Sequence, residues 1–139
     1  MTECIACKSE NIETVVAVER VVYKGHELQV PLEYSTCKNC GREFVPRSQI
    51  LRGEAAVRDA RKKFDGLMSS QEIAKARTSL SLSQEQASKV FGGGRNAFSK
   101  YERGEVSQSV AMDKLIRVCL KHQHVFQELA EKAGVKVDS

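Results

Sequence analysis

The sequence lacks long apolar runs, and this absence limits where the protein can act. No segment reaches the roughly 18 apolar residues that a membrane-spanning helix needs. The N-terminus has neither the basic nor the apolar region of a secretory signal peptide. We therefore expect a soluble, cytoplasmic protein that makes no membrane contact.

Residues suited to catalysis are also scarce. The chain has 3 His, namely His26, His122 and His124. None stands beside a plausible nucleophile or in a ligand spacing with a carboxylate motif, so we expect all three at the surface. The sequence therefore predicts a protein that is not an enzyme.

The charge surplus is small and lies in the second half of the chain. The formal net charge is +4; residues 1–68 contain 11 Lys and Arg against 10 Asp and Glu, and residues 69–139 contain 11 against 8. A surplus of this size does not establish nucleic-acid binding. Evidence for nucleic-acid binding must therefore come from the positions of the charged residues.

Two CxxC pairs near the N-terminus are the strongest chemical signal: Cys4, Cys7, Cys37 and Cys40. Thiolates in two such pairs fit the corners of a tetrahedron around Zn²⁺, which predicts one structural zinc ion with no open coordination position. Two disulfides or a thioredoxin-like redox pair are the alternatives. No βαβ pattern surrounds either pair, and a reducing compartment favours metal over disulfides.

The segment between the CxxC pairs predicts a β-hairpin. Residues 12–23 are rich in Val and predict a strand, and residues 24–26 predict a turn. After this turn, apolar or aromatic residues occupy every second position and should share one face of the sheet: Leu28, Val30, Leu32 and Tyr34. Pro31 cannot donate a ladder hydrogen bond, so it predicts a strand edge or a bend. Such a hairpin would bring the two CxxC pairs together.

A helix is predicted over residues 48–64, weakened by Gly53, and residues 65–70 are the expected hinge. The fold class is therefore α+β with two domains: a zinc-binding domain with a linker helix over residues 1–68, and an all-α domain over residues 69–139.

Basic residues near the end of the helix at 48–64 should form a solvated face, with a phosphate-binding patch as the alternative: Arg58, Arg61, Lys62 and Lys63.

The second half predicts five helices with clear boundaries. Capping boxes at Ser69/Glu72 and Ser83/Gln86 begin the first two, and the glycines at 92–94 separate the second from the third. The five ranges are residues 71–79, 84–91, 95–103, 110–121 and 125–133. Cys119, on the fourth helix, is expected to be a small buried residue.

The helices at 84–91 and 95–103 form a predicted helix-turn-helix, whose second helix enters the major groove of DNA. Phe98 and Tyr101 lie three residues apart and should pack on Ala87, Val90 and Leu115. The opposite face then carries polar residues at helical spacing: Asn96, Ser99, Lys100 and Arg103.

The residue types suggest separate roles in DNA binding. An Asn amide can pair with adenine and a Lys ammonium with guanine, so Asn96 and Lys100 are the predicted base contacts, with Ser99 a weaker candidate. Phosphate contacts are assigned to the remaining candidates: Arg95, Gln84 and Arg103.

These same residues carry a family resemblance. Residues 82–88 and 99–104 resemble the helix-turn-helix of the phage-repressor-like (XRE) superfamily. Residues 91–102, which include the glycine triplet and the sequence Asn96-Ala97-Phe98-Ser99, resemble the MqsA (YgiT-type) antitoxins, as do the two CxxC pairs.

The resemblance implies a two-domain antitoxin of a type II toxin–antitoxin system. In that family the zinc domain blocks an mRNA-cleaving ribonuclease toxin, and the other domain forms a homodimer on a palindromic double-stranded operator and represses the operon. It also implies base contacts by Asn96 and Lys100. Lys100 stands where the family has Arg, so its guanine contact should be weaker. The segment 105–109 lacks the prolines usual there.

The alternative function is a solitary zinc-ribbon transcription regulator without a toxin, or one that senses metal or redox state. Both possibilities share the DNA-binding half. The fourth and fifth helices offer the expected dimer surface, through Val118, Val125, Phe126 and Leu129.

Overall fold

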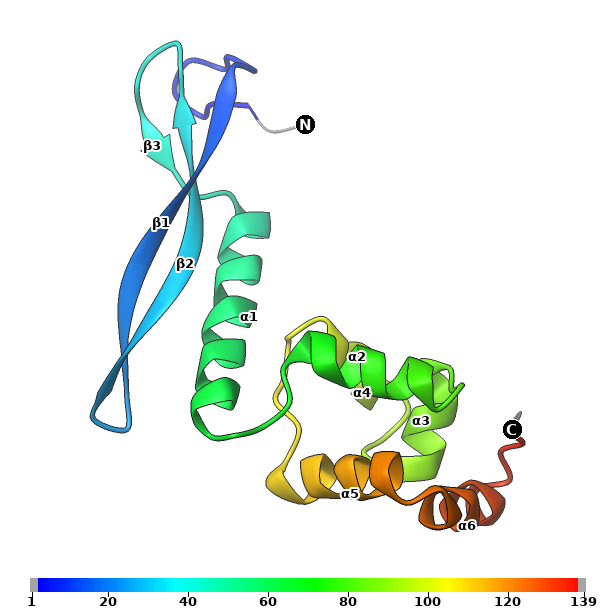
Figure 1. The fold of residues 1–139 in the computed structure, drawn as a ribbon. Coiled ribbons are helices and arrows are strands. Elements are labelled where there is room, and N and C mark those ends of the chain that lie inside the picture. The colour runs from blue at the N-terminus through cyan, green and yellow to red at the C-terminus, as the bar shows by residue number, and fades with distance from the viewer. Residues whose placement is uncertain (1–2, 138–139) are drawn as a thin grey trace. The chain divides into compact units, whose positions relative to one another are not determined.

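The computed structural model describes residues 3–137, and its elements confirm the α+β class: a three-stranded antiparallel sheet comes first and helices follow (Figure 1). The chain divides into two compact units, the N-terminal unit Met1–Arg61 and the helical unit Lys62–Ser139. This division falls inside a helix, whereas the sequence placed the boundary after residue 68, and that domain assignment stays a prediction.

A long β-hairpin dominates the N-terminal unit. Strands β1 (Ile12–Tyr23) and β2 (His26–Cys37) pair along their whole length, as predicted. Lys24 and Gly25 between them have φ angles of 50° and 77°. Two successive positive φ values match the right-handed twist of paired strands in a two-residue turn, and glycine adopts such a φ without steric cost.

Strand β3 (Glu43–Phe44) pairs with Ser35 and Thr36, so within residues 3–137 most of β2 has β1 as its single neighbour. Pro31 lies opposite Val18 in that part of β2. β2 is the middle strand of the sheet, so the predicted edge holds only locally: among the described residues no second strand pairs with β2 at Pro31, where a residue without an N–H is tolerated. The alternating residues of β2 also behave as predicted, with Val30 buried and Leu28, Leu32 and Tyr34 half-buried.

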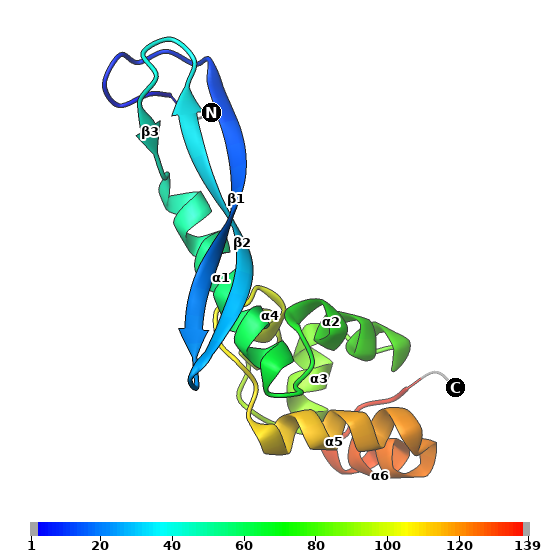
Figure 2. The same ribbon diagram turned by 60° about the vertical axis from the view of Figure 1, so that its left-hand side comes forward.

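Helix α1 (Arg47–Phe64) begins one residue before its predicted start and runs beside the hairpin (Figure 2). Buried Ser35 donates a hydrogen bond to the Gln49 side chain at 3.0 Å. Further along α1, the Arg52 and Glu33 side chains pair at 2.8 Å.

The apolar interior of the N-terminal unit is small. Among the residues that the structure describes there, the buried hydrophobic side chains are Cys4, Val30 and Cys37. Two of these three are predicted metal ligands. Hydrophobic burial alone therefore supplies little of the free energy that keeps this unit folded.

The helical unit holds the main hydrophobic core. Its elements are α2 (Ser70–Ser79), α3 (Gln84–Phe91), α4 (Ala97–Glu102), α5 (Val110–Lys121) and α6 (Gln123–Ala133). Both predicted capping boxes are present, at Ser69/Glu72 and Ser83/Gln86, and each satisfies free N–H groups at a helix start. Cys119 is buried as predicted, and burial raises the pKa of its thiol.

Three sequence predictions need correction here. The third helix was predicted over residues 95–103, but α4 covers only Ala97–Glu102, because the positive φ values of the glycine triplet delay its start and Gly104, at φ 73°, ends it. Phe126 was predicted at a dimer surface but is fully buried in the core. Lys62 is buried too, so the predicted solvated face of α1 is wrong at that position.

A buried carboxylate ties the segment before α2 to α5. The Asp113 side chain accepts hydrogen bonds from the Met68 amide at 2.8 Å and from Arg117 at 2.7 Å. Gln108 donates to the Met68 carbonyl and to Asp113. Burial by itself would raise the pKa of Asp113, but these donors outweigh it and the pKa lies below its usual range.

No helix within residues 3–137 has both the length and the apolar character required to cross a membrane.

Candidate metal centre and nucleic-acid interface

The structure brings all four predicted cysteine ligands together. Their sulfur atoms lie within 4.8 Å of one another, with Sγ–Sγ distances of 3.6 Å between Cys4 and Cys40 and 3.5 Å between Cys7 and Cys37. Four sulfurs about 2.3 Å from one zinc ion would be about 3.8 Å apart at the corners of a tetrahedron. The cluster therefore fits a tetrahedral metal ion, and all four cysteines are free rather than disulfide-bonded.

The two CxxC loops have the same backbone geometry. In each, the amide four residues after the first cysteine donates to that cysteine's carbonyl at 2.8 Å, from Lys8 to Cys4 and from Gly41 to Cys37. Both donors have positive φ, 59° at Lys8 and 78° at Gly41. Lys38 also donates to the Asn11 carbonyl at 2.9 Å, which holds the second loop against the start of β1.

Hydrogen bonds at the cluster favour thiolate at some sulfurs. Asn39 donates to the Cys7 Sγ at 3.5 Å and lowers the pKa of Cys7 to about 6. A hydrogen bond from the Cys7 backbone amide likewise lowers the pKa of Cys4. The pKa of Cys40 is raised to about 11: the Arg42 backbone amide lowers it, but contact with the Cys4 sulfur and burial outweigh that effect. A bound cation would favour the thiolate form of clustered sulfurs. Sequence analysis did not identify Asn39 as a contributor.

In the helical unit, the glycine triplet forms the turn between α3 and α4. Gly92, Gly93 and Gly94 have φ angles of 90°, 97° and 95°. A Cβ on Gly93 would lie 3.0 Å from the Cβ of Ala97 and 3.2 Å from the Tyr101 hydroxyl. Glycine is required at this position by backbone conformation and by the close approach of α4.

Helix α4 turns its apolar side inward as predicted. Phe98 and Tyr101 are buried with their ring centroids 5.4 Å apart, and Ala87 and Val90 belong to the same core cluster, with Leu115 packed against it.

The predicted DNA-contacting residues around α4 are mostly exposed. Asn96 occupies the N-cap position, makes no capping hydrogen bond with its side chain, and is exposed, as are Arg95 and Lys100. Ser99 is half-buried. Arg103 is exposed and forms a 3.2 Å ion pair with Glu105.

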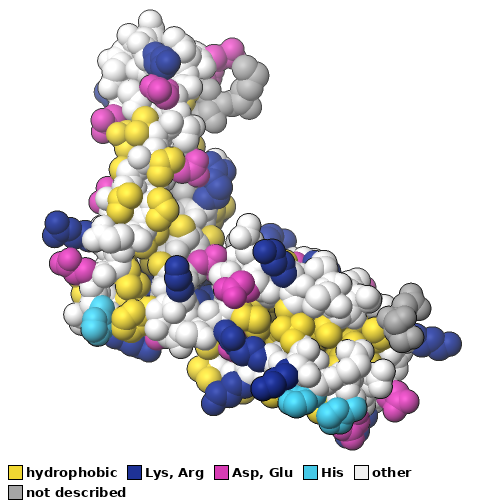
Figure 3. All heavy atoms as spheres, in the orientation of Figure 1, with side chains coloured by type: hydrophobic (Ala, Val, Ile, Leu, Met, Phe, Trp, Pro, Cys, Tyr) yellow, Lys and Arg dark blue, Asp and Glu magenta, His cyan; other side chains and the backbone are white. Residues whose placement is uncertain are grey.

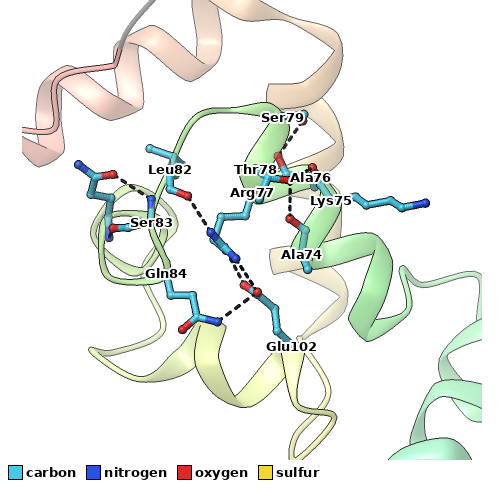
Figure 4. A network of polar contacts seen from close by, with 11 residues as sticks. Ala74, Lys75, Ala76, Arg77, Thr78, Ser79, Leu82, Ser83, Gln84 and Glu102 are labelled. Atoms are coloured by element: carbon cyan, nitrogen blue, oxygen red, sulfur yellow. Dashed lines mark hydrogen bonds and ion pairs between the residues drawn. The ribbon is translucent and has the colours of Figure 1, made fainter.

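A partly buried ion pair links α4 to α2, and sequence analysis missed it. Arg77 forms two hydrogen bonds with Glu102, at 2.7 and 2.8 Å, and a third with the Leu82 carbonyl at 2.9 Å (Figure 4). Burial would raise the pKa of Glu102, but Arg77 and then Gln84 outweigh it, so the pKa is lowered. Residue spacing along the sequence does not predict this pair, because Arg77 and Glu102 lie on separate helices.

Gln84 takes part in the same network. Its amide donates to the Glu102 side chain at 3.1 Å. The sequence assigned Gln84 to a phosphate contact, and in the structure its side chain helps to fix α4 against α3. Because α4 has only 6 residues, these polar contacts and its buried aromatic rings set its position.

Comparison with known proteins gives a consistent result. The sequence model of a family described as the antitoxin component of a bacterial toxin–antitoxin system, MqsA, matches residues 2–130. The chain is also similar to Antitoxin MqsA of Escherichia coli (strain K12), with 47% identity over 57 residues. That alignment spans 41% of this chain and 44% of the relative, less than half of either protein.

Proposed function

The chain belongs to the MqsA antitoxin family, and we propose that it neutralises an mRNA-cleaving toxin and represses its own operon as a DNA-binding homodimer. The helical unit would bind the operator, and the N-terminal unit would bind one zinc ion and the toxin. The exposed polar side of the short helix α4 is the observation that supports DNA binding.

Asn96 and Lys100 supply the direct base contacts in this proposal. Both side chains are exposed, while Phe98 and Tyr101 of the same helix are buried in the core. An Asn amide can make two hydrogen bonds with adenine in the major groove, and a Lys ammonium can donate to guanine. Arg95, exposed just before the helix, would contact a phosphate, which positions the protein without selecting sequence.

The dimer would bind two inverted half-sites about 34 Å apart, one helical turn of DNA, or a small multiple of that distance. Val118, exposed on α5, and the partly buried Val125 and Leu129 on α6 are candidate dimer contacts. Two chains per operator duplex are therefore expected in a native mass measurement.

Asn96→Ala and Arg95→Ala should weaken DNA binding in different ways. Losing the Asn96 amide should cost about 1 to 3 kcal/mol on the operator and relax the preference at one base pair. Losing Arg95 should weaken binding to all sequences and reduce the slope of log K against log salt by about one. Affinities measured on operator and on random duplexes at several salt concentrations distinguish the two effects. Equal losses on both duplexes for Asn96→Ala would refute the base contact.

Zinc is the proposed metal, since a tetrahedral set of four cysteine sulfurs suits it. The ion would have a structural role, because four protein ligands leave no position for water or substrate. Its charge would allow all four sulfurs to bind as thiolates.

Strand β1 is the proposed toxin-binding edge. It is the outer strand of the sheet and pairs only with β2 in the described structure, so its other edge can accept a further strand. Val16 and Val18 on β1 are 62% and 64% exposed, and hydrophobic side chains are visible along the hairpin (Figure 3). An unpaired strand edge with exposed valines is suited to strand addition by a protein partner.

Val16→Lys and Val18→Lys together should weaken the toxin complex at least about tenfold, or 1.4 kcal/mol, because Lys on an edge strand disfavours pairing. The toxin is expected to be encoded beside this gene, and binding to its purified product can be measured by calorimetry. Val110→Lys, at an exposed Val of the helical unit, is the matched control and should leave affinity unchanged. Unchanged toxin binding by the double variant would exclude β1 as the contact.

A further inference from the structure

The N-terminal unit contains a groove that neither metal binding nor strand addition uses. It has a volume of about 720 Å³ and lies between the hairpin and α1. Ligand pockets for small organic molecules typically have volumes of about 300 to 1,000 Å³. The groove is therefore large enough to hold such a molecule within a single unit.

The residues that line the groove differ along its length. Near β3 its lining is apolar and aromatic, with Tyr34, Val45 and Ile50. Its middle is lined by Ala17, Leu32 and Gly53, and three carboxylates also belong to the lining: Glu19, Glu33 and Glu54. Helix α1 runs past both regions toward the hairpin turn, where its Arg61 lies over the Tyr23 ring.

Three arginines line the part of the groove nearest the hairpin turn: Arg20, Arg58 and Arg61. Arg20 lies 4.0 Å from Glu27, and Arg58 lies 4.0 Å from Glu54.

Arg61 differs from the other two arginines. Its guanidinium carbon lies 5.4 Å from the Tyr23 ring centroid, and across residues 3–137 it forms no ion pair with a carboxylate. Its N–H groups therefore remain available to a ligand. Glu33, which also lines the groove, is paired with Arg52, and Arg52 is not part of the lining.

We propose that this groove binds an amphipathic carboxylate, with its alkyl chain between β2 and α1 and its head group at Arg61. A guanidinium matches a carboxylate with two parallel hydrogen bonds, and an alkyl chain gains free energy by leaving water for an apolar lining. From Ile50 to Arg61 the helix rises about 16 Å, so one elongated molecule can reach both ends. The groove shares no residue with the proposed operator contacts or with the four-cysteine cluster.

Calorimetric titration of the metal-loaded full chain with sodium dodecanoate, below its micelle concentration, tests the proposal. One molecule should bind per chain. Dodecyltrimethylammonium, with the same tail and the opposite charge, and acetate, with no tail, should each bind at least tenfold more weakly. Equal binding of dodecanoate and dodecyltrimethylammonium would mean that Arg61 does not select the head group.

Matched variants locate the ligand within the groove. Arg61→Gln should weaken dodecanoate binding at least tenfold, whereas Arg47→Gln, which removes an equal charge outside the lining, should not. Gly53→Leu should abolish binding by filling the groove. Gly53→Ala should retain binding, because its Cβ would lie 3.5 Å from Leu32, an ordinary contact. Both Gly53 changes favour the helix, so thermal unfolding should show folded proteins.

Besides equal binding of the two amphiphiles, two results would overturn the proposal. One is the absence of saturable dodecanoate binding to the wild-type chain. The other is dodecanoate binding that Gly53→Leu leaves intact, because the ligand would then lie elsewhere. If dodecanoate fails to bind while Gly53→Leu abolishes toxin binding, the groove is a protein contact instead.

Discussion

Removing the metal should unfold the β-hairpin and its CxxC loops while the helical unit stays folded. Of the three buried hydrophobic residues described in the N-terminal unit, Cys4 and Cys37 are also proposed metal ligands. Zinc contributes about 10 to 16 kcal/mol to the folding of small zinc domains, far more than burial of Val30 can supply. The helical unit has its own hydrophobic core and should not respond.

Amide NMR spectra recorded before and after chelation measure this effect for each unit separately. Cys37→Ser removes one proposed ligand. Even without a chelator, its hairpin signals should match those of the chelated wild-type protein. Cys119→Ala removes a cysteine outside the cluster, at a buried position of the helical unit, and should retain bound metal. Dispersed hairpin signals that persist in metal-free protein, with metal content verified by mass spectrometry, would show that the metal is not needed for folding.

Glu102→Ala should destabilise the helical unit by about 3 to 5 kcal/mol, because it leaves the Arg77 guanidinium without its partner. The side chains of this pair are only 16% and 9% exposed for Arg77 and Glu102, so water can replace little of the lost interaction. Gln84 would lose its acceptor as well. Urea unfolding at neutral pH, followed by helical circular dichroism, gives the change in free energy.

Two carboxylates make the stability of the helical unit depend on pH. Glu102 and Asp113 both have lowered pKa values, so their stabilisation is complete above the unfolded-state pKa values of about 4. It is lost as the pH falls through their folded-state pKa values. The helical unit should therefore unfold more easily in acid, and Glu102→Ala should show a smaller loss of stability on acidification than the wild-type chain.

Glu105→Ala is the matched control for Glu102→Ala. Glu105 pairs with Arg103, but both side chains are more than half exposed. An exposed pair contributes at most about 1 kcal/mol, so this variant should unfold almost like the wild type. Equal losses for the two variants would mean that the Arg77–Glu102 pair does not hold α4 in place.

Local sequence patterns predicted most of the elements. Three elements match their predicted ranges: residues 12–23, 84–91 and 110–121. Hydrophobic periodicity and capping residues can predict them because both involve residues only a few positions apart in the sequence. The error at α4 has the same local origin. Three consecutive glycines with positive φ keep residues 95 and 96 out of the helix, and the amino-acid types alone do not specify how long the turn is.

The sequence by itself identified the four cysteines of the cluster, since the CxxC spacing brings the two sulfurs of each pair together and the predicted hairpin brings the two pairs together. Only the tertiary structure revealed the Arg77–Glu102–Gln84 network and the groove beside Arg61. These features join residues that are 18 to 41 positions apart, from Gln84 to Glu102 and from Arg20 to Arg61. Their proximity depends on how helices and strands pack, which no local pattern of residues encodes.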